Sequence, residues 1–122
     1  MTGERVLLVD DNVGTAVLVA GILRDEGATV DVSHSAEAAK MQALRKRPTA
    51  VILHLGAPRD AAAMLTERFR RLEALQKARI IVLSWESDAR ATDVNGADVV
   101  LYRPFSPERI RDELLRLLRG AV

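Results

Sequence analysis

The sequence predicts an α/β fold: a five-stranded parallel sheet with helices on both faces. Short, continuous apolar runs, typical of strands buried on both faces, recur along the chain. Segments with apolar residues at helical spacing alternate with them. This alternation favours a parallel sheet, because two parallel strands need a crossover connection, usually a helix, between them.

Five apolar runs define the strands, in the order 5–9, 28–32, 50–53, 79–83 and 98–102. The second run differs from the others, since polar and apolar residues alternate in it. Alternation is typical of a strand with one face less buried, so we expect this strand to lie nearer an edge of the sheet.

The first helix is recognised from the helical spacing of Val17, Leu18, Gly21 and Ile22, and Gly27 is expected to stop it. The second is expected to run to about residue 47.

Three residues are placed to cap later helices: Ser35, Asp60 and Ser106. The segment 86–95 is polar and only weakly helical. The short basic runs at 45–47 and 68–71 are interpreted as solvated helix faces.

Composition excludes several classes of protein. The chain has 122 residues, which suits one domain over 1–122. It has no cysteine, so a disulfide scaffold, a thiol nucleophile and a Cys-ligated metal are excluded. The net charge of +1 gives no reason to expect direct nucleic-acid binding. No apolar run is long enough to span a bilayer, and no signal segment precedes the first strand, so a cytoplasmic location is expected.

Polar residues gather where the predicted strands end. Asp10 and Asp11 follow the first strand, His54 the third, Ser84 the fourth and Arg103 the fifth. Ligands of parallel α/β sheets bind at the carboxyl ends of the strands, so these side chains form the candidate site.

The order of these motifs resembles the receiver domains of two-component response regulators, and the resemblance covers essentially the whole chain. It rests on Val-Asp-Asp-Asn at 9–12, the turn ending in Pro58, Leu-Ser at 83–84 and Arg-Pro-Phe at 103–105. It implies a flavodoxin-like (βα)5 fold. It also implies metal-binding roles for Asp10 and Asp11, and phosphoryl contacts from the positions of Ser84 and Arg103.

Three positions depart from the pattern that the resemblance implies. The phosphoacceptor Asp is replaced by His54, the Lys before the proline is Arg103, and the aromatic switch is Val100. The chain therefore lacks both the usual nucleophile and the usual switch. We interpret it as a degenerate receiver, or pseudo-receiver, that is not an enzyme.

Charge favours the same interpretation. The family site has three Asp and one Lys, a net charge of −2 that suits Mg²⁺. Here Asp10, Asp11 and Arg103 give −1 with neutral His54 and 0 with protonated His54. Mg²⁺ also prefers oxygen to imidazole, so weak Mg²⁺ binding or none is expected, and no cofactor. We hypothesise that His54 and Arg103 form a metal-free ion-pair network with the two acids.

The predicted function is protein–protein interaction in a phosphorelay or two-component pathway. The expected partner is a signalling protein such as a histidine kinase, a phosphotransfer protein or an output domain, with the last helix and its Arg109, Arg116 and Arg119 as the contact surface. The protein is expected to be a monomer or weak dimer. Two alternatives stay open. One is a phosphorylatable receiver, if His54 is a substitution or itself accepts phosphate. The other is a divalent-metal module built from Asp10, Asp11 and His54.

Overall fold

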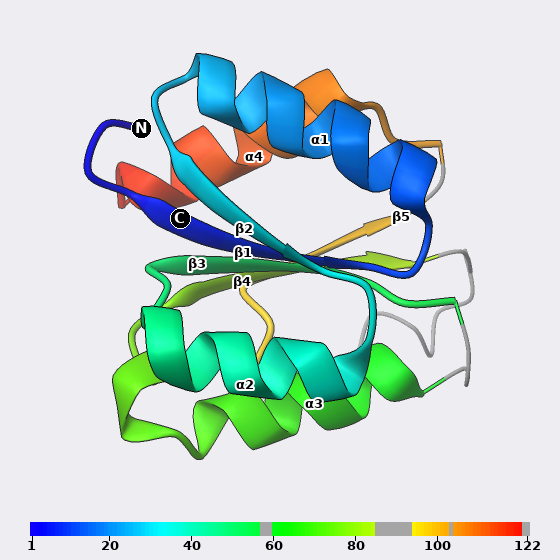
Figure 1. The fold of residues 1–122 in the computed structure, drawn as a ribbon, viewed down its shortest axis with the longest axis vertical. Helices are drawn as coiled ribbons and strands as arrows, with labels where there is room; N and C mark the ends of the chain where they lie inside the picture. Colours follow the sequence, from blue (N-terminus) through cyan, green and yellow to red (C-terminus); the bar gives the residue numbers. More distant parts are fainter. Residues whose placement is uncertain (57–59, 85–93, 103, 121–122) are drawn as a thin grey trace.

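Five parallel strands form one sheet in the order β2-β1-β3-β4-β5 (Figure 1). The computed structural model describes residues 1–56, 60–84, 94–102 and 104–120. The strands are β1 (Arg5–Asp10), β2 (Thr29–Ser33), β3 (Ala50–His54), β4 (Arg79–Ser84) and β5 (Val99–Tyr102). The predicted fold class is confirmed, and the alternating second strand lies at an edge of the sheet, as expected.

Helices cover both faces of the sheet. They are α1 (Val13–Asp25), α2 (Ala36–Lys46), α3 (Ala61–Arg70) and α4 (Pro107–Leu118), with a short 3₁₀ helix, η1 (Glu73–Leu75). Figure 1 shows α1 and α4 side by side on one face, and α2 and α3 on the other. Most of the segment 86–95 lies outside the described residues. No helix in the described part of the chain is long and apolar enough to cross a membrane.

The predicted caps are mostly confirmed. The Ser35 hydroxyl accepts the Ala38 N–H at 3.2 Å, and the Ser106 hydroxyl accepts the Arg109 N–H at 3.1 Å. Asp60 stands at the start of α3 but makes no side-chain cap bond.

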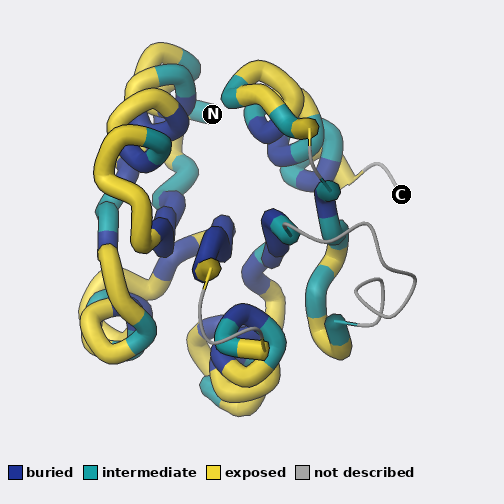
Figure 2. The backbone as a smooth tube through the Cα atoms, turned by 90° about the vertical axis from the view of Figure 1, so that its right-hand side faces the viewer, coloured by how far each residue is buried: buried dark blue, intermediate teal, exposed yellow. Residues whose placement is uncertain are grey.

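Two apolar clusters, one on each side of the sheet, make up the core (Figure 2). Successive strand residues alternate between them: Leu8 and Ile52 pack under α1 and α4, whereas Leu7 and Val51 pack under α2 and α3. This alternation decides which helices each side chain at the strand ends will meet.

Helix α1 buries a different face from the one its predicted spacing marks. Its buried residues are Ala16, Val19, Ala20 and Leu23. Val17 and Leu18 are instead largely exposed. The helix is apolar nearly all round, so spacing alone could not select its inner face.

The interpretation of the basic run at 68–71 as a solvated face is wrong for Arg70. Its guanidinium donates to the carbonyl oxygens of Gly96 at 2.8 Å and Ala78 at 2.6 Å, and pairs with Asp98 at 3.0 Å. It also donates to the carbonyls of Leu75 and Gln76. Arg70 therefore ties the end of α3 to the segments that lead into β4 and β5.

Candidate functional site

Asp10 and His54 are adjacent at the carboxyl end of the sheet. They are register partners at the last positions of β1 and β3. Strand alternation turns both toward the α1 and α4 side, since Leu8 and Ile52, two positions earlier, pack there. The His54 Nδ1 atom lies 3.2 Å from Asp10 Oδ1. Asp10 is 0% and His54 1% exposed, so the contact is fully buried.

The Asp10 carboxylate is held by the local chain. Its Oδ1 atom accepts the Asn12 N–H at 2.9 Å, while Oδ2 is buried without a hydrogen-bond partner in the described structure. A buried carboxylate needs donors or a positive neighbour to offset its lost hydration. The Asn12 N–H meets this need at Oδ1, and the His54 Nδ1 atom lies 3.2 Å from the same oxygen.

Asn12 also explains how the chain leaves β1. Its side-chain oxygen accepts the Thr15 N–H at 3.0 Å and so caps α1. The Asp-Asp-Asn run is therefore both a helix start and a carboxylate cluster.

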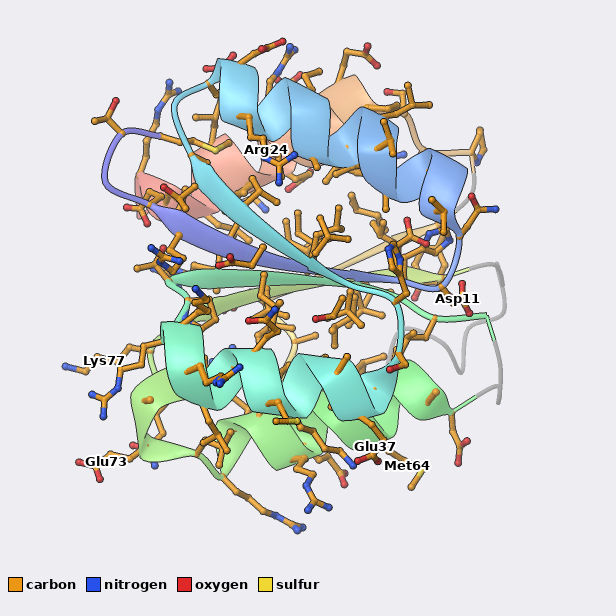
Figure 3. The ribbon with its side chains drawn as sticks, viewed as in Figure 1. Asp11, Arg24, Glu37, Met64, Glu73 and Lys77 are labelled. Carbon is orange, nitrogen blue, oxygen red and sulfur yellow. The ribbon has the colours of Figure 1, made fainter. Side chains whose placement is uncertain are left out.

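Asp11 lies in quite different surroundings from Asp10. It is exposed, at the start of α1 (Figure 3), and its Oδ2 accepts the Gly56 N–H at 2.8 Å. Its own N–H donates to the His54 carbonyl at 3.3 Å. Asp11 thus fastens the turn after β1 to the turn after β3.

His34 follows the end of β2 and is exposed. Its Nδ1 atom nevertheless lies 2.9 Å from the Asp10 carbonyl oxygen. Because a carbonyl only accepts, Nδ1 must carry the hydrogen of this bond. This support for the end of β1 was not anticipated.

The ring of His54 packs against Phe105. The two ring centroids are 5.4 Å apart and the planes meet at 86°, an edge-to-face arrangement. Phe105 immediately precedes Ser106, the N-cap of α4. The sequence placed Phe105 in the Arg-Pro-Phe motif, but nothing in the motif indicated this ring contact.

For the other predicted site residues, the structure gives positions in the sheet for Ser84 and Val100 but does not describe Arg103. Ser84 ends β4, next to β3 in the sheet, with Tyr102 as its register partner on β5. Val100 is half-buried and packs on the α2 and α3 side. Arg103 lies outside the described residues.

The donor set does not fit Mg²⁺. One Asp11 oxygen accepts the Gly56 N–H, and one Asp10 oxygen accepts the Asn12 N–H. The side chain beside Asp10 is the imidazole of His54, which offers nitrogen and not oxygen. Mg²⁺ takes oxygen ligands in near-octahedral geometry. Among the described residues of the site, Asp10 Oδ2 is a buried carboxylate oxygen without a hydrogen-bond partner, which is a feature that would suit a cation. Within the described residues, no three His, Cys, Asp or Glu side chains are grouped to hold a metal ion.

Comparison with known proteins agrees with this arrangement of strand ends. Residues 6–115 match the family described as the response regulator receiver domain. The chain belongs to this family. As a receiver domain, it is a module of two-component signalling.

Two known proteins are similar to this chain in sequence. A response regulator receiver protein of Anaeromyxobacter sp. (strain Fw109-5) is 32% identical over 110 residues, 89% of this chain and 46% of that protein. An uncharacterised 14.6 kDa protein of Leptolyngbya boryana is 30% identical, over 93% of this chain and 86% of that one. The chain thus spans less than half of the first relative's length.

Among solved structures, the chemotaxis response regulator CheY4 of Vibrio cholerae has a TM-score of 0.85 and 24% identity. The match covers 95% of this chain and 99% of that one. At this identity the likeness concerns the fold.

Proposed function

We propose that this receiver domain is a pseudo-receiver, which signals through protein–protein contacts without phosphorylation of an aspartate. The observation that carries the proposal is His54, an imidazole at the acceptor position, buried between Asp10 and Phe105. An acyl phosphate needs a carboxylate nucleophile, and the candidate acceptor position offers none.

The contacts of Asp10 and Asp11 support the proposal. Asp10 faces His54, and Asp11 holds the Gly56 N–H. Both carboxylates therefore have structural partners within the protein. The role of the site is then to hold the ends of β1 and β3 together, and the protein is a binding module and not an enzyme.

The contact surface that we propose for a partner is the outer face of α4. Arg109 and Arg119 are exposed there, and they suit an acidic partner surface. Arg116 is less available than expected, because it is half-buried and forms a pair with Glu113 at 2.8 Å.

Intact mass spectrometry after incubation with acetyl phosphate and Mg²⁺ tests the proposal. We expect no adduct on the wild-type chain, with circular dichroism showing that it is folded. The matched variant His54→Asp restores a carboxylate at the same position and is expected to gain one phosphoryl group. A wild-type species heavier by one phosphoryl group would contradict the proposal, and its acid and base lability would distinguish phosphohistidine from acyl phosphate.

A further inference from the structure

Helix α1 carries an exposed apolar face. Val13, Val17 and Leu18 are 61%, 65% and 64% exposed, the most exposed group of large aliphatic residues on any one helix of the described chain. They lie within six consecutive positions. Single apolar residues on a surface are ordinary, but a contiguous group of this kind marks a contact surface.

Two glycines lie on the same face. Gly14 and Gly21 are exposed and seven residues apart, which places them in line two turns apart between Val17 and Leu18. Neither has a positive φ. A Cβ at Gly21 would meet nothing within 4 Å, and at Gly14 it would meet the Asn12 side-chain oxygen at 3.4 Å, an ordinary contact.

The fold of one chain therefore does not require these glycines. Gly21, in the middle of the helix, costs about 1 kcal/mol relative to Ala. A bare strip of backbone between two aliphatic side chains allows another helix to approach closely, as small residues do at tight helix contacts.

We propose that this face binds a second copy of the same chain, with the two α1 helices antiparallel about a two-fold axis between residues 17 and 18. This contact is independent of the proposed function. The face is symmetric about that axis, since Val17 would oppose Leu18 and Gly14 would oppose Gly21. A two-fold contact needs such a self-complementary surface.

Charge selects the antiparallel arrangement. Asp11 lies six positions before Val17, and Arg24 lies six positions after Leu18, so each Asp11 would meet the other copy's Arg24. Both residues are exposed, at opposite ends of α1 (Figure 3). Arg24 donates from Nη2 to the Val30 carbonyl, which leaves further guanidinium donors. Parallel helices would instead bring like charges together, and antiparallel helices also pair opposite dipole ends.

The dimer is expected to be weak. One helix face buries less than the roughly 800 Å² per partner of a standard interface, so we expect a dissociation constant in the micromolar range or weaker.

Sedimentation equilibrium over a concentration series up to about 1 mM tests the contact. We expect the wild-type mass to rise toward that of a dimer. Leu18→Lys should remain monomeric. Met64→Lys, which alters a residue 61% exposed on α3, should behave like the wild type. A wild-type chain that stays monomeric throughout, or a Met64→Lys variant that is equally monomeric, would overturn the proposal.

Disulfide trapping tests the axis, because the chain has no cysteine of its own. Val17→Cys and Leu18→Cys should each cross-link to themselves. Two copies of residue 14 would stand about 10 Å apart along the axis, beyond the roughly 7 Å Cα separation that a disulfide spans. Gly14→Cys should therefore cross-link only to Gly21→Cys, and self-linked Gly14→Cys would overturn the antiparallel arrangement.

Gly21→Ala separates the role of the glycine from helix stability. The variant should melt at a higher temperature at low concentration, because alanine favours the helix. It should also dimerise more weakly, since a methyl group would keep the backbones apart. Unchanged dimerisation in this variant would overturn the close approach.

Discussion

The imidazole of His54 stands where an aspartate would place a second negative charge beside Asp10. Two buried carboxylates side by side repel each other, and a cation or shared proton must offset that repulsion. In this chain a ring nitrogen of His54, and not a second carboxylate, lies 3.2 Å from Asp10 Oδ1. The ring adds an apolar edge that packs on Phe105. His54 thus contacts a polar residue, Asp10, and an apolar residue, Phe105.

Removal of this ring should destabilise the protein. We expect His54→Ala to lower the free energy of unfolding by about 2–4 kcal/mol, because it leaves a cavity beside Phe105 and deprives buried Asp10 of its neighbour. Urea denaturation measures the change. His34→Ala is the matched control: it removes an exposed histidine that holds the Asp10 carbonyl, so a loss of about 1 kcal/mol is expected. Equal losses for the two variants would contradict a special role for the buried ring.

At the residue scale, the sequence predicted which groups gather but not how they bond. Asp10, Asp11 and His54 could be located because a polar residue after a buried strand marks the strand's end. The bonds from the Gly56 N–H to Asp11 and from His34 to the Asp10 carbonyl depend on the tertiary approach of different turns. No spacing in the chain encodes those approaches.

Strands β1 and β3 were predictable because their burial is nearly complete. Residues Val6 to Asp10 and Ala50 to His54 are all buried, and such segments are apolar apart from their polar last residues. The inner face of α1 was not predictable, because apolar residues on its exposed side mask the helical period. The departure from expected patterning coincides with the face that we propose as a dimer contact.

Arg70 connects the end of α3 to the segments before β4 and β5, and sequence patterns did not predict this role. We expect Arg70→Ala to lower the free energy of unfolding by about 2–4 kcal/mol, because it removes charge-assisted hydrogen bonds to several carbonyls and to Asp98. Arg70→Lys should recover only part of this loss, since an ammonium cannot reproduce the planar fork. Thermal or urea denaturation provides the measurement.

The neighbouring exposed Arg71 supplies the control for this anchor. Arg71→Ala should change the free energy of unfolding by no more than about 0.5 kcal/mol, as is usual at exposed positions. If Arg71→Ala were as costly as Arg70→Ala, general charge on α3 and not the guanidinium contacts of Arg70 would be responsible.

At the scale of the whole molecule, β1 and β3 are neighbouring interior strands of the sheet, and both layers of helices pack on them. A change at Asp10 or His54 therefore acts on the strands that both clusters share. The stability of the entire fold reports what the site binds, because a ligand that binds only the native state raises that stability by mass action.

The dependence of thermal stability on Mg²⁺ concentration therefore tests whether the site binds the ion. We expect Mg²⁺ to leave the thermal midpoint of the wild type unchanged, because its donor set does not suit the ion. His54→Asp should be less stable than the wild type without metal, owing to the adjacent carboxylates, and should gain stability with Mg²⁺ by about 2.7 kcal/mol at a hundredfold excess over the dissociation constant. His54→Asn, which removes the ring without adding a charge, should gain far less. A wild-type midpoint that rose with Mg²⁺ as steeply as that of His54→Asp would show that the imidazole does not displace the ion, and the proposal of a metal-free site would have to be abandoned.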